Sequence, residues 1–279
     1  MIGQLATLLR RWRYASASPW RNILRAVFRG DRHHCPVCHS DLGAFLPLPA
    51  LYAREIAKSG FPHGLGDFET LNIEAYSCPV CGASDRDRFM AAYVETVIIP
   101  GLPENAQVVD FAPGQGLSAF LRRKLPAANR YVRADKFAAG VDLAVDLCDM
   151  PEIRSESTDF WICSHVLEHV DDDARAAREL YRILVAGGRG IVLAPVLIAD
   201  RYAPRATPAT TERERWRYYG QGDHVRLYSR QQLIHLLLSA GFIVTPVQAS
   251  DSLGARAGVF GIQSRATLYV VGRPVAPRL

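Results

Sequence analysis

The stretch VVDFAPGQGLSAFL, residues 108–121, decides the fold of this chain. Two β-branched residues lead into Asp110, a short segment with Gly114 and Gly116 follows, and a helical pattern begins directly after it. This order predicts a strand, a tight turn and a helix whose N-terminus faces a ligand. The turn has neither the glycine spacing of a dinucleotide-binding loop nor the lysine of a P-loop. We therefore expect its backbone amides to contact a smaller polar group.

Strand-like and helical segments alternate from about residue 90 onward. Strand patterns occupy residues 107–111, 130–134, 141–145, 160–164, 190–194, 242–247 and 267–271. Helical patterns occupy residues 117–124, 172–184 and 230–240. This alternation predicts an α/β fold with a mostly parallel sheet of seven strands. The Gly-rich segment between the last two strands predicts no helix, so these strands should form an antiparallel hairpin at the sheet edge.

Two identical Cys-Pro-Val-Cys segments precede this region, with 39 residues between them. They supply four thiolates that can close tetrahedrally around Zn²⁺: Cys35, Cys38, Cys78 and Cys81. Gly82 suits the turn after the second pair. We expect a structural, zinc-ribbon-like element rather than disulfides or free thiols, because no secretory signal is visible. Three nearby histidines could replace a thiolate, namely His33, His34 and His39.

The positive charge of the chain is concentrated at its N-terminus. Residues 1–34 carry seven arginines and one acidic residue, whereas the rest of this chain of net charge +5 sums to −1. A neutral body does not favour nucleic acid as a partner. Residues 1–32 predict an arm of two amphipathic helices, the second capped by Ser18 and ending near Gly30.

The arm is expected to pack on its own domain, to associate with a second copy, or to make a peripheral membrane contact. Its Arg-rich, acid-poor composition also fits an organelle transit peptide. No apolar run approaches the roughly 20 residues that span a bilayer. We therefore expect a cytoplasmic protein, with membrane association through the arm as the alternative.

From residue 86 to about residue 275 the chain resembles the class I S-adenosylmethionine-dependent methyltransferases. VVDFAPGQG resembles the first motif of that family, with Ala112 in place of its first glycine. The motif is followed in order by segments similar to the later family motifs: YVRADKF, VDLCDMP, STDFWICSHVLEHVDDD, ELYRILVAGGRGIVLAP and HVRLYSRQQLIHLLLSAGF. The resemblance implies a Rossmann-like sheet and S-adenosylmethionine as cofactor. It implies these cofactor-binding residues: Asp110, Ala112, Gly114, Gly116, Asp135, Asp146, Leu147 and Ser164.

Within that set the resemblance gives three residues a definite position. Asp135 would bind the ribose hydroxyls, and Asp146 and Leu147 would lie at the adenine. The connection between Asp135 and Val141 lacks the helix that is usual in the family. We expect the zinc element to close that side of the adenine pocket.

His165 and His224 are the candidate general bases, because methyl transfer from a sulfonium requires a positioned, deprotonated nucleophile. The string from His165 to Glu168 and His169 also matches a zinc-protease pattern, but it follows a strand instead of lying on a long helix. In the resembled family Glu168 and His169 would help to pack the next helix. Residues 196–227 predict a substrate lid or a subunit contact, with four contact residues: Trp216, Arg217, Tyr218 and Tyr219.

The chain thus divides into an arm (1–32), a zinc element (33–85) and a methyltransferase domain (86–279). The expected methyl acceptor is a hydroxyl of a small metabolite or a glycan-type compound. One alternative is an RNA base methyltransferase that uses the zinc element to bind RNA. The other is a non-catalytic protein that binds the cofactor and docks a partner through its zinc element.

Overall fold

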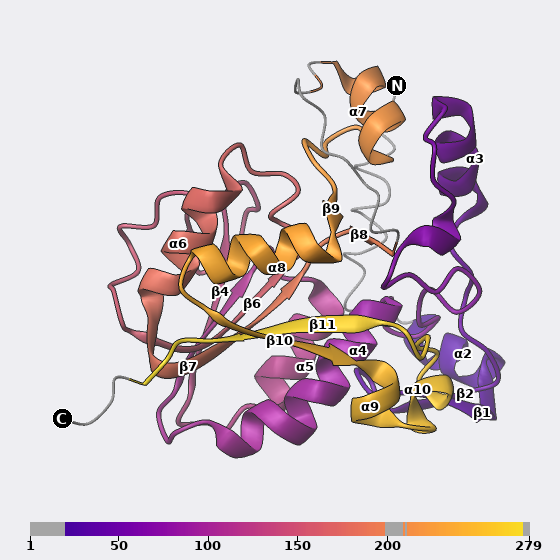
Figure 1. Cartoon of the computed structure of the whole chain (residues 1–279). Coiled ribbons are helices and arrows are strands. Elements are labelled where there is room, and N and C mark those ends of the chain that lie inside the picture. Colours follow the sequence, from indigo (N-terminus) through magenta and orange to yellow (C-terminus); the bar gives the residue numbers. More distant parts are fainter. Residues whose placement is uncertain (1–19, 199–208, 210, 276–279) are drawn as a thin grey trace.

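Figure 1 shows the computed structural model of the chain, which describes residues 20–198, 209 and 211–275. Its centre is a seven-stranded sheet of the order β10-β11-β7-β6-β3-β4-β5. The strands are β3 (Gln107–Phe111), β4 (Arg130–Asp135), β5 (Leu143–Ala144), β6 (Thr158–Ser164), β7 (Leu184–Leu193), β10 (Ile243–Gln248) and β11 (Thr267–Gly272). The predicted α/β fold with seven strands is confirmed.

Five neighbouring strands of the sheet, β5, β4, β3, β6 and β7, run parallel. Strand β11 pairs antiparallel with β7, and β10 pairs antiparallel with β11, so the predicted antiparallel edge is confirmed. The chain passes from β3 to β4 and β5 on one side and then returns to β6 on the other side of β3. Such a reversal opens a crevice at the carboxyl ends of β3 and β6, where open α/β sheets bind ligands.

Helices cover both faces of the sheet (Figure 1). Helices α4 (Asp85–Tyr93) and α5 (Gln115–Lys124) lie on one face, and α6 (Asp173–Ile183) and α8 (Arg230–Ser239) lie on the other. Successive strand residues point to opposite faces, so Val108 packs in the core with α4 and α5, while Val109 packs in the core with α6. After α4 the chain continues through η2 (Val94–Ile98) and η3 (Ile99–Gly101).

The N-terminal region consists of α2 (Trp20–Val27) and the antiparallel pair β1 (Arg29–Cys35) and β2 (Ser40–Leu42). The predicted first helix of the arm and the cap Ser18 lie outside the described residues. Gly30 does not end the second helix as predicted: it lies in β1, where a β-carbon would come within 2.5 Å of Gly43 Cα. Ile23 is 51% exposed and Val27 is 69% exposed. The predicted contact of the arm with a membrane or a second copy stays a prediction.

The last two strands are joined by two short helices, α9 (Ala249–Leu253) and α10 (Arg256–Val259), so the prediction of no helix there is wrong. Leu253 and Ala257 are buried in the same core as the cysteine element. Burial of these apolar side chains outweighs the low helix propensity of the glycines. None of the helices in the described part of the chain combines the length and the apolar character needed to cross a bilayer.

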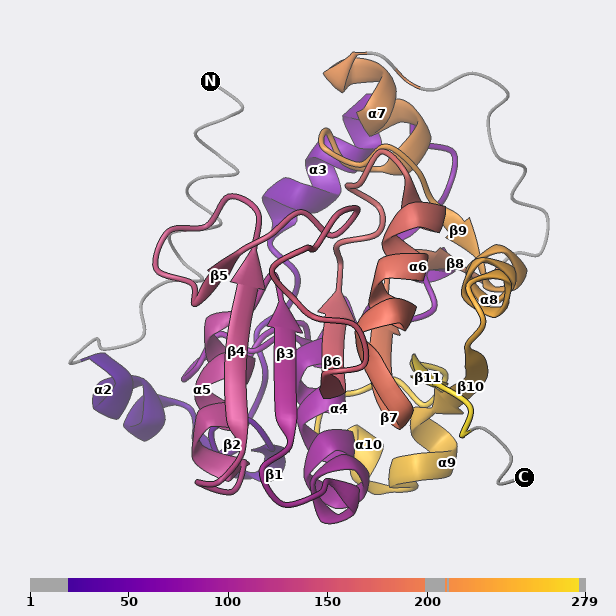
Figure 2. The ribbon, with the colours of Figure 1, turned by 90° about the vertical axis from the view of Figure 1, so that its left-hand side faces the viewer.

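A small cap lies beyond the carboxyl ends of the central strands (Figure 2). It is built from α3 (Ala50–Ser59), η1 (Leu65–Asp67) and α7 (Glu212–Tyr219), with the short parallel pair β8 (Val196–Leu197) and β9 (Tyr228–Ser229) below it. Ile56 of α3, Phe61, Tyr219 of α7 and Leu227 share its hydrophobic core. The segment between the two cysteine pairs therefore packs against the segment predicted as a lid.

Candidate functional site

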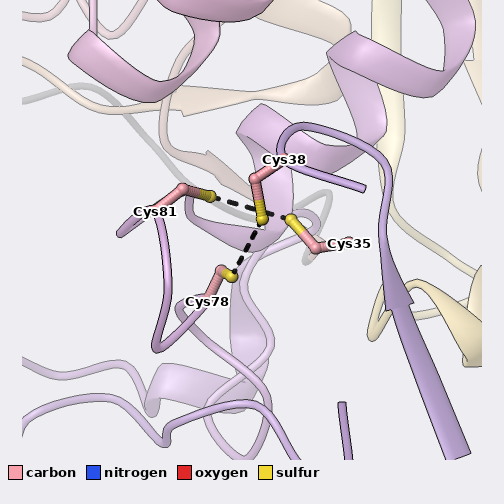
Figure 3. Close-up of side chains that lie close together, drawn as sticks. All are labelled: Cys35, Cys38, Cys78 and Cys81. Carbon is pink, nitrogen blue, oxygen red and sulfur yellow. Dashed lines mark hydrogen bonds between the residues drawn. The ribbon is translucent and has the colours of Figure 1, made fainter. Parts of the chain in front are cut away.

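The four cysteines of the two Cys-Pro-Val-Cys segments converge on one point (Figure 3). Cys35 Sγ lies 3.8 Å from Cys81 Sγ, and Cys38 Sγ lies 3.8 Å from Cys78 Sγ. Four sulfurs at about 2.3 Å from a central zinc ion form a tetrahedron with edges of about 3.8 Å. Sulfurs joined in a disulfide would be about 2.05 Å apart, and all four thiols are free. The spacing therefore fits one tetrahedral ion.

Both cysteine segments end in the same backbone turn. The amide of His39 donates to Cys35 O, and the amide of Gly82 donates to Cys78 O. His39 and Gly82 both adopt a left-handed φ, of 55° and 72°. The expected role of Gly82 is confirmed, and His39 takes the equivalent position in the first turn. Among the described residues, the group that could hold a metal here contains the four cysteines and no histidine.

The cysteine element packs directly on α5, the helix that follows the glycine turn. A β-carbon at Gly116 would lie 3.4 Å from Cys81 O. Arg123, at the other end of α5, donates to Val37 O at 2.7 Å. The predicted zinc element and the opening motif therefore form one packed unit.

Three of the predicted cofactor residues lie around the switch point between β3 and β6. Ala112 follows β3, and its amide donates to Ala134 O in β4. Asp135 is the last residue of β4 and Ser164 is the last residue of β6. Because parallel strands end at the same edge of the sheet, the turn after β3 lies between these two side chains.

The turn itself has the shape of a ligand-binding loop. Ala112 has a φ of 51°, a left-handed conformation that strains alanine but not glycine. No side chain caps the N-terminus of α5 at Gly114, as is also the case for α3, α9 and α10, whereas side chains cap α4, α6, α7 and α8. An uncapped helix N-terminus attracts an anionic group, and the methionine carboxylate of the expected cofactor is such a group.

Asp110 lies below this turn and is 2% exposed. Tyr131 Oη donates to Asp110 Oδ2 at 2.7 Å and lies 3.0 Å from Ser118 Oγ. Burial raises the pKa of Asp110 to about 7, against the lowering effect of the Tyr131 hydrogen bond. The carboxyl group is therefore held in the core by Tyr131 of β4, and its predicted contact with the cofactor stays a prediction.

The loop after β4 arranges the predicted adenosine residues. Asp135 Oδ1 accepts from the amides of Phe137 and Ala138 at 2.6 and 2.7 Å. Asp146 pairs with Lys136 at 2.7 Å, and that hydrogen bond lowers its pKa. Leu147 is buried in the core, and its predicted place at the adenine is untested. The connection contains no helix, as expected, and the prediction that the cysteine element closes this side also remains untested.

Three histidines and a glutamate meet after β6. His165 Nδ1 lies 2.9 Å from Glu168 Oε1, and His169 Nε2 lies 4.0 Å from the same oxygen. The rings of His169 and His224 stand edge to face with centroids 4.8 Å apart. The structure thus brings both candidate bases to one carboxylate. His165 has a left-handed φ of 58°, and it follows β6 directly, so the zinc-protease context is absent.

Glu168 is fully buried. Burial raises its pKa, but the neighbouring histidines, His165 first, lower it to about 2. Burial lowers the pKa of His224 to about 4. The family resemblance assigned Glu168 and His169 to packing of the next helix, and it did not predict that they form a cluster with His165 and His224. The repeated histidines around Glu168, together with a histidine at 224, were the signal for it.

The four predicted lid residues lie at the C-terminal end of α7. Trp216 faces Tyr52 of α3, with ring centroids 6.2 Å apart, and Tyr219 is 4% exposed. Arg217 is exposed and lies 5.8 Å from the Tyr218 ring. Trp216 and Tyr219 therefore help to join α7 to α3 within the cap, and a contact of any of these residues with an acceptor stays a prediction.

These observations agree with the comparison with known protein families. A family model described as a methyltransferase domain matches residues 83–247, more than half of the chain. The chain belongs to this family, and it is a class I S-adenosylmethionine-dependent methyltransferase. The enzyme interpretation thus prevails over the non-catalytic alternative. No curated protein sequence matches the chain.

Solved structures resemble the chain at low sequence identity. A chain from the complex of the Haloferax volcanii Trm112 methyltransferase activator with a methyltransferase is 19% identical, with a TM-score of 0.42, covering 69% of this chain and 94% of that one. A methyltransferase from Bacillus halodurans is 14% identical, with a TM-score of 0.42, covering 66% and 99%. Haemonchus contortus phosphoethanolamine N-methyltransferase 2, in complex with S-adenosylmethionine, is 13% identical, with a TM-score of 0.43, covering 66% and 52%.

Proposed function

We propose that the enzyme transfers the methyl group of S-adenosylmethionine to a hydroxyl oxygen of a small metabolite or glycan-type compound. One observation supports the proposal: the glycine turn and the His165–Glu168 pair follow β3 and β6, which are adjacent parallel strands that end at the same edge of the sheet. The turn would bind the cofactor, and the pair would face the acceptor. Proximity and a positioned base are what a displacement at a sulfonium methyl group requires.

His165 is the proposed general base. A carboxylate 2.9 Å from Nδ1 favours the tautomer with the proton on Nδ1 and the lone pair on Nε2. The acceptor hydroxyl would give its proton to Nε2 while its oxygen bonds to the methyl carbon. The carbon–sulfur bond breaks and its electron pair goes to sulfur, which releases S-adenosylhomocysteine and the methylated acceptor. His165 then returns its proton to water.

The cofactor would be held by Asp135 and by the turn. The Asp135 carboxylate would accept from the ribose hydroxyls, and the uncapped N-terminus of α5 would face the methionine carboxylate. The four cysteines would hold a structural Zn²⁺, which leaves no open position for catalysis. Its role would be to fix the element on which α5 rests.

A small acceptor is favoured over RNA by two features. The body of the chain beyond residue 34 carries a net charge of −1, which provides no electrostatic footprint for a polyanion. The cysteine element is packed into the core, with Cys35 fully buried and Cys78 1% exposed. One side of the element therefore packs on α5 and α10, which reduces the surface that is open to a long ligand.

Incubation of the purified protein with methyl-labelled S-adenosylmethionine and fractionated cell extract tests the proposal. We expect label in the small polar fraction. His165→Asn is the matched variant, because asparagine tolerates a left-handed φ, and it should lower the rate by about 100-fold or more while cofactor binding persists. The exposed His235→Ala should have no effect. Label in RNA, or a fully active His165→Asn protein, would contradict the proposal.

A further inference from the structure

We infer that Glu168, His169 and His224 form a second metal site, which binds a divalent transition-metal ion such as Zn²⁺. One ligand atom from each of these side chains lies within 4.8 Å of the others. An ion at about 2.0–2.2 Å from each donor would hold them about 3–4 Å apart. Small side-chain rotations would therefore close the group around one ion.

The hydrogen bond of His169 fixes which of its nitrogens can bind a metal. His169 Nδ1 lies 3.1 Å from the carbonyl oxygen of Asp223. A carbonyl only accepts, so Nδ1 carries the proton and Nε2 carries a lone pair. In the neutral imidazole, that lone pair faces Glu168 Oε1 at 4.0 Å. Two electron-rich atoms facing each other call for a cation between them, and a backbone carbonyl on the other ring nitrogen is the usual support of a metal-bound histidine.

Two further atoms of the group lack partners. Among the described residues, Glu168 Oε2 and His224 Nδ1 are buried and have no hydrogen-bond partner. Glu168 is fully buried and His224 is 4% exposed. A buried carboxylate oxygen without a hydrogen bond is costly unless a charge compensates it. Arg86 of α4 acts on Glu168 through space, but Glu168 Oε2 accepts no hydrogen bond from it.

Two imidazoles and one carboxylate are a donor set that suits Zn²⁺ and similar divalent ions. Three protein ligands leave at least one open position. The partly exposed His169 and His165, at 31% and 23% of their side chains, mark the open side. If the proposed function holds, an acceptor oxygen would occupy that position, where the ion would lower the pKa of the hydroxyl beside His165.

Metal stoichiometry of the full-length protein tests the inference without cofactor or acceptor. Native mass spectrometry after stripping and reconstitution with Co²⁺ should show two ions, one of them giving the thiolate-to-cobalt absorption of the four cysteines. Glu168→Gln should keep the thiolate absorption and weaken binding of the second ion by about 100-fold or more. His235→Ala should still bind two ions.

His169→Gln provides a second variant, because this side chain is partly exposed and its loss disturbs the core less. It should also bind one ion. A wild-type protein that binds one ion, or variants that still bind two, would overturn the inference and leave an imidazolium–carboxylate cluster. A wild-type protein that binds two ions but transfers no methyl group would contradict the proposed function and leave the metal site intact.

Discussion

Gly116 of α5 lies against the second cysteine segment: a β-carbon on Gly116 would be 3.4 Å from the carbonyl oxygen of Cys81 and 3.5 Å from Ala83 Cβ. The first turn of α5 therefore rests on the second cysteine segment. The same turn carries the amides expected to face the cofactor. Gly116 is thus part of the glycine motif from which the fold was predicted, and it also allows α5 to pack closely on the cysteine element.

Loss of the ion held by the cysteines should weaken the cofactor site. Cys81→Ser removes one thiolate beside Gly116, and we expect the affinity for S-adenosylhomocysteine to fall by about tenfold or more, since the support of α5 is lost. Calorimetry and metal analysis of the variant measure this. Cys148→Ser, outside the cysteine cluster, should bind like the wild type. An unchanged affinity in a Cys81→Ser protein that has lost its ion would contradict the coupling.

Ala112→Gly should stabilise the protein. Its φ of 51° strains alanine but not glycine, and the relief exceeds the extra chain entropy of glycine, for a net gain of up to about 1 kcal/mol. The expected rise in Tm is about 1–4 °C, measured by thermal unfolding. Ala134→Gly, in the adjacent strand, should lower Tm instead. A lower Tm for Ala112→Gly would show that the methyl group packs favourably.

Asp110 should make stability depend on pH. Its folded-state pKa, raised by burial to about 7, lies above the value near 3.9 of an unfolded chain. The folded protein therefore holds the proton more tightly, so this stabilising contribution is complete below about pH 4 and is lost as pH rises to about 7. Asp110→Asn cannot ionise. Between about pH 4 and pH 7, the free energy of unfolding of Asp110→Asn should therefore rise relative to that of the wild type by up to about 4 kcal/mol.

Urea unfolding of wild type and Asp110→Asn at about pH 4 and pH 8 measures that difference, and the exposed Glu104→Gln serves as control. A constant difference between wild type and Asp110→Asn at both pH values would show that Asp110 is not held protonated by burial.

Arg88 joins the cysteine element to the loop after α10. It is fully buried and donates to five backbone carbonyls, those of Ala75, Tyr76, Ala83, Phe260 and Gly261. Lysine has fewer donors and cannot copy this fork, so Arg88→Lys should lower the free energy of unfolding by about 2–4 kcal/mol. Chemical denaturation checks this against the exposed Arg122→Lys. Equal stability of the two variants would be the contrary result.

Much of the fold could be predicted from sequence because its signals are local. The branched apolar residues around Val108 and Val109 and the turn at Gly114 define β3 and α5 without reference to distant residues. The spacing of the cysteines likewise requires only that four thiols reach one ion. The helices α9 and α10 could not be predicted, because their stability comes from packing on the cysteine element and not from their own residues.

The candidate site could be predicted from sequence only in part, for a similar reason. His165 and His224 were identified separately, but their shared neighbour Glu168 depends on how the segment after α7 folds back over β6. The amide of Val225 donates to Glu168 O at 2.9 Å, and this long-range bond brings His224 to the carboxylate. Arg88 was invisible for the same reason, since its partners come from three separate segments.

Binding of S-adenosylhomocysteine, followed by titration calorimetry, tests the central claim most directly. The account predicts one site per chain in the wild type and no change in Glu104→Ala, an exposed position before β3. In Asp135→Ala the affinity should be about 10- to 100-fold lower, because charge-assisted hydrogen bonds to the ribose are lost. Absence of heat with the wild type, or an Asp135→Ala protein that binds as tightly as its parent, would contradict it.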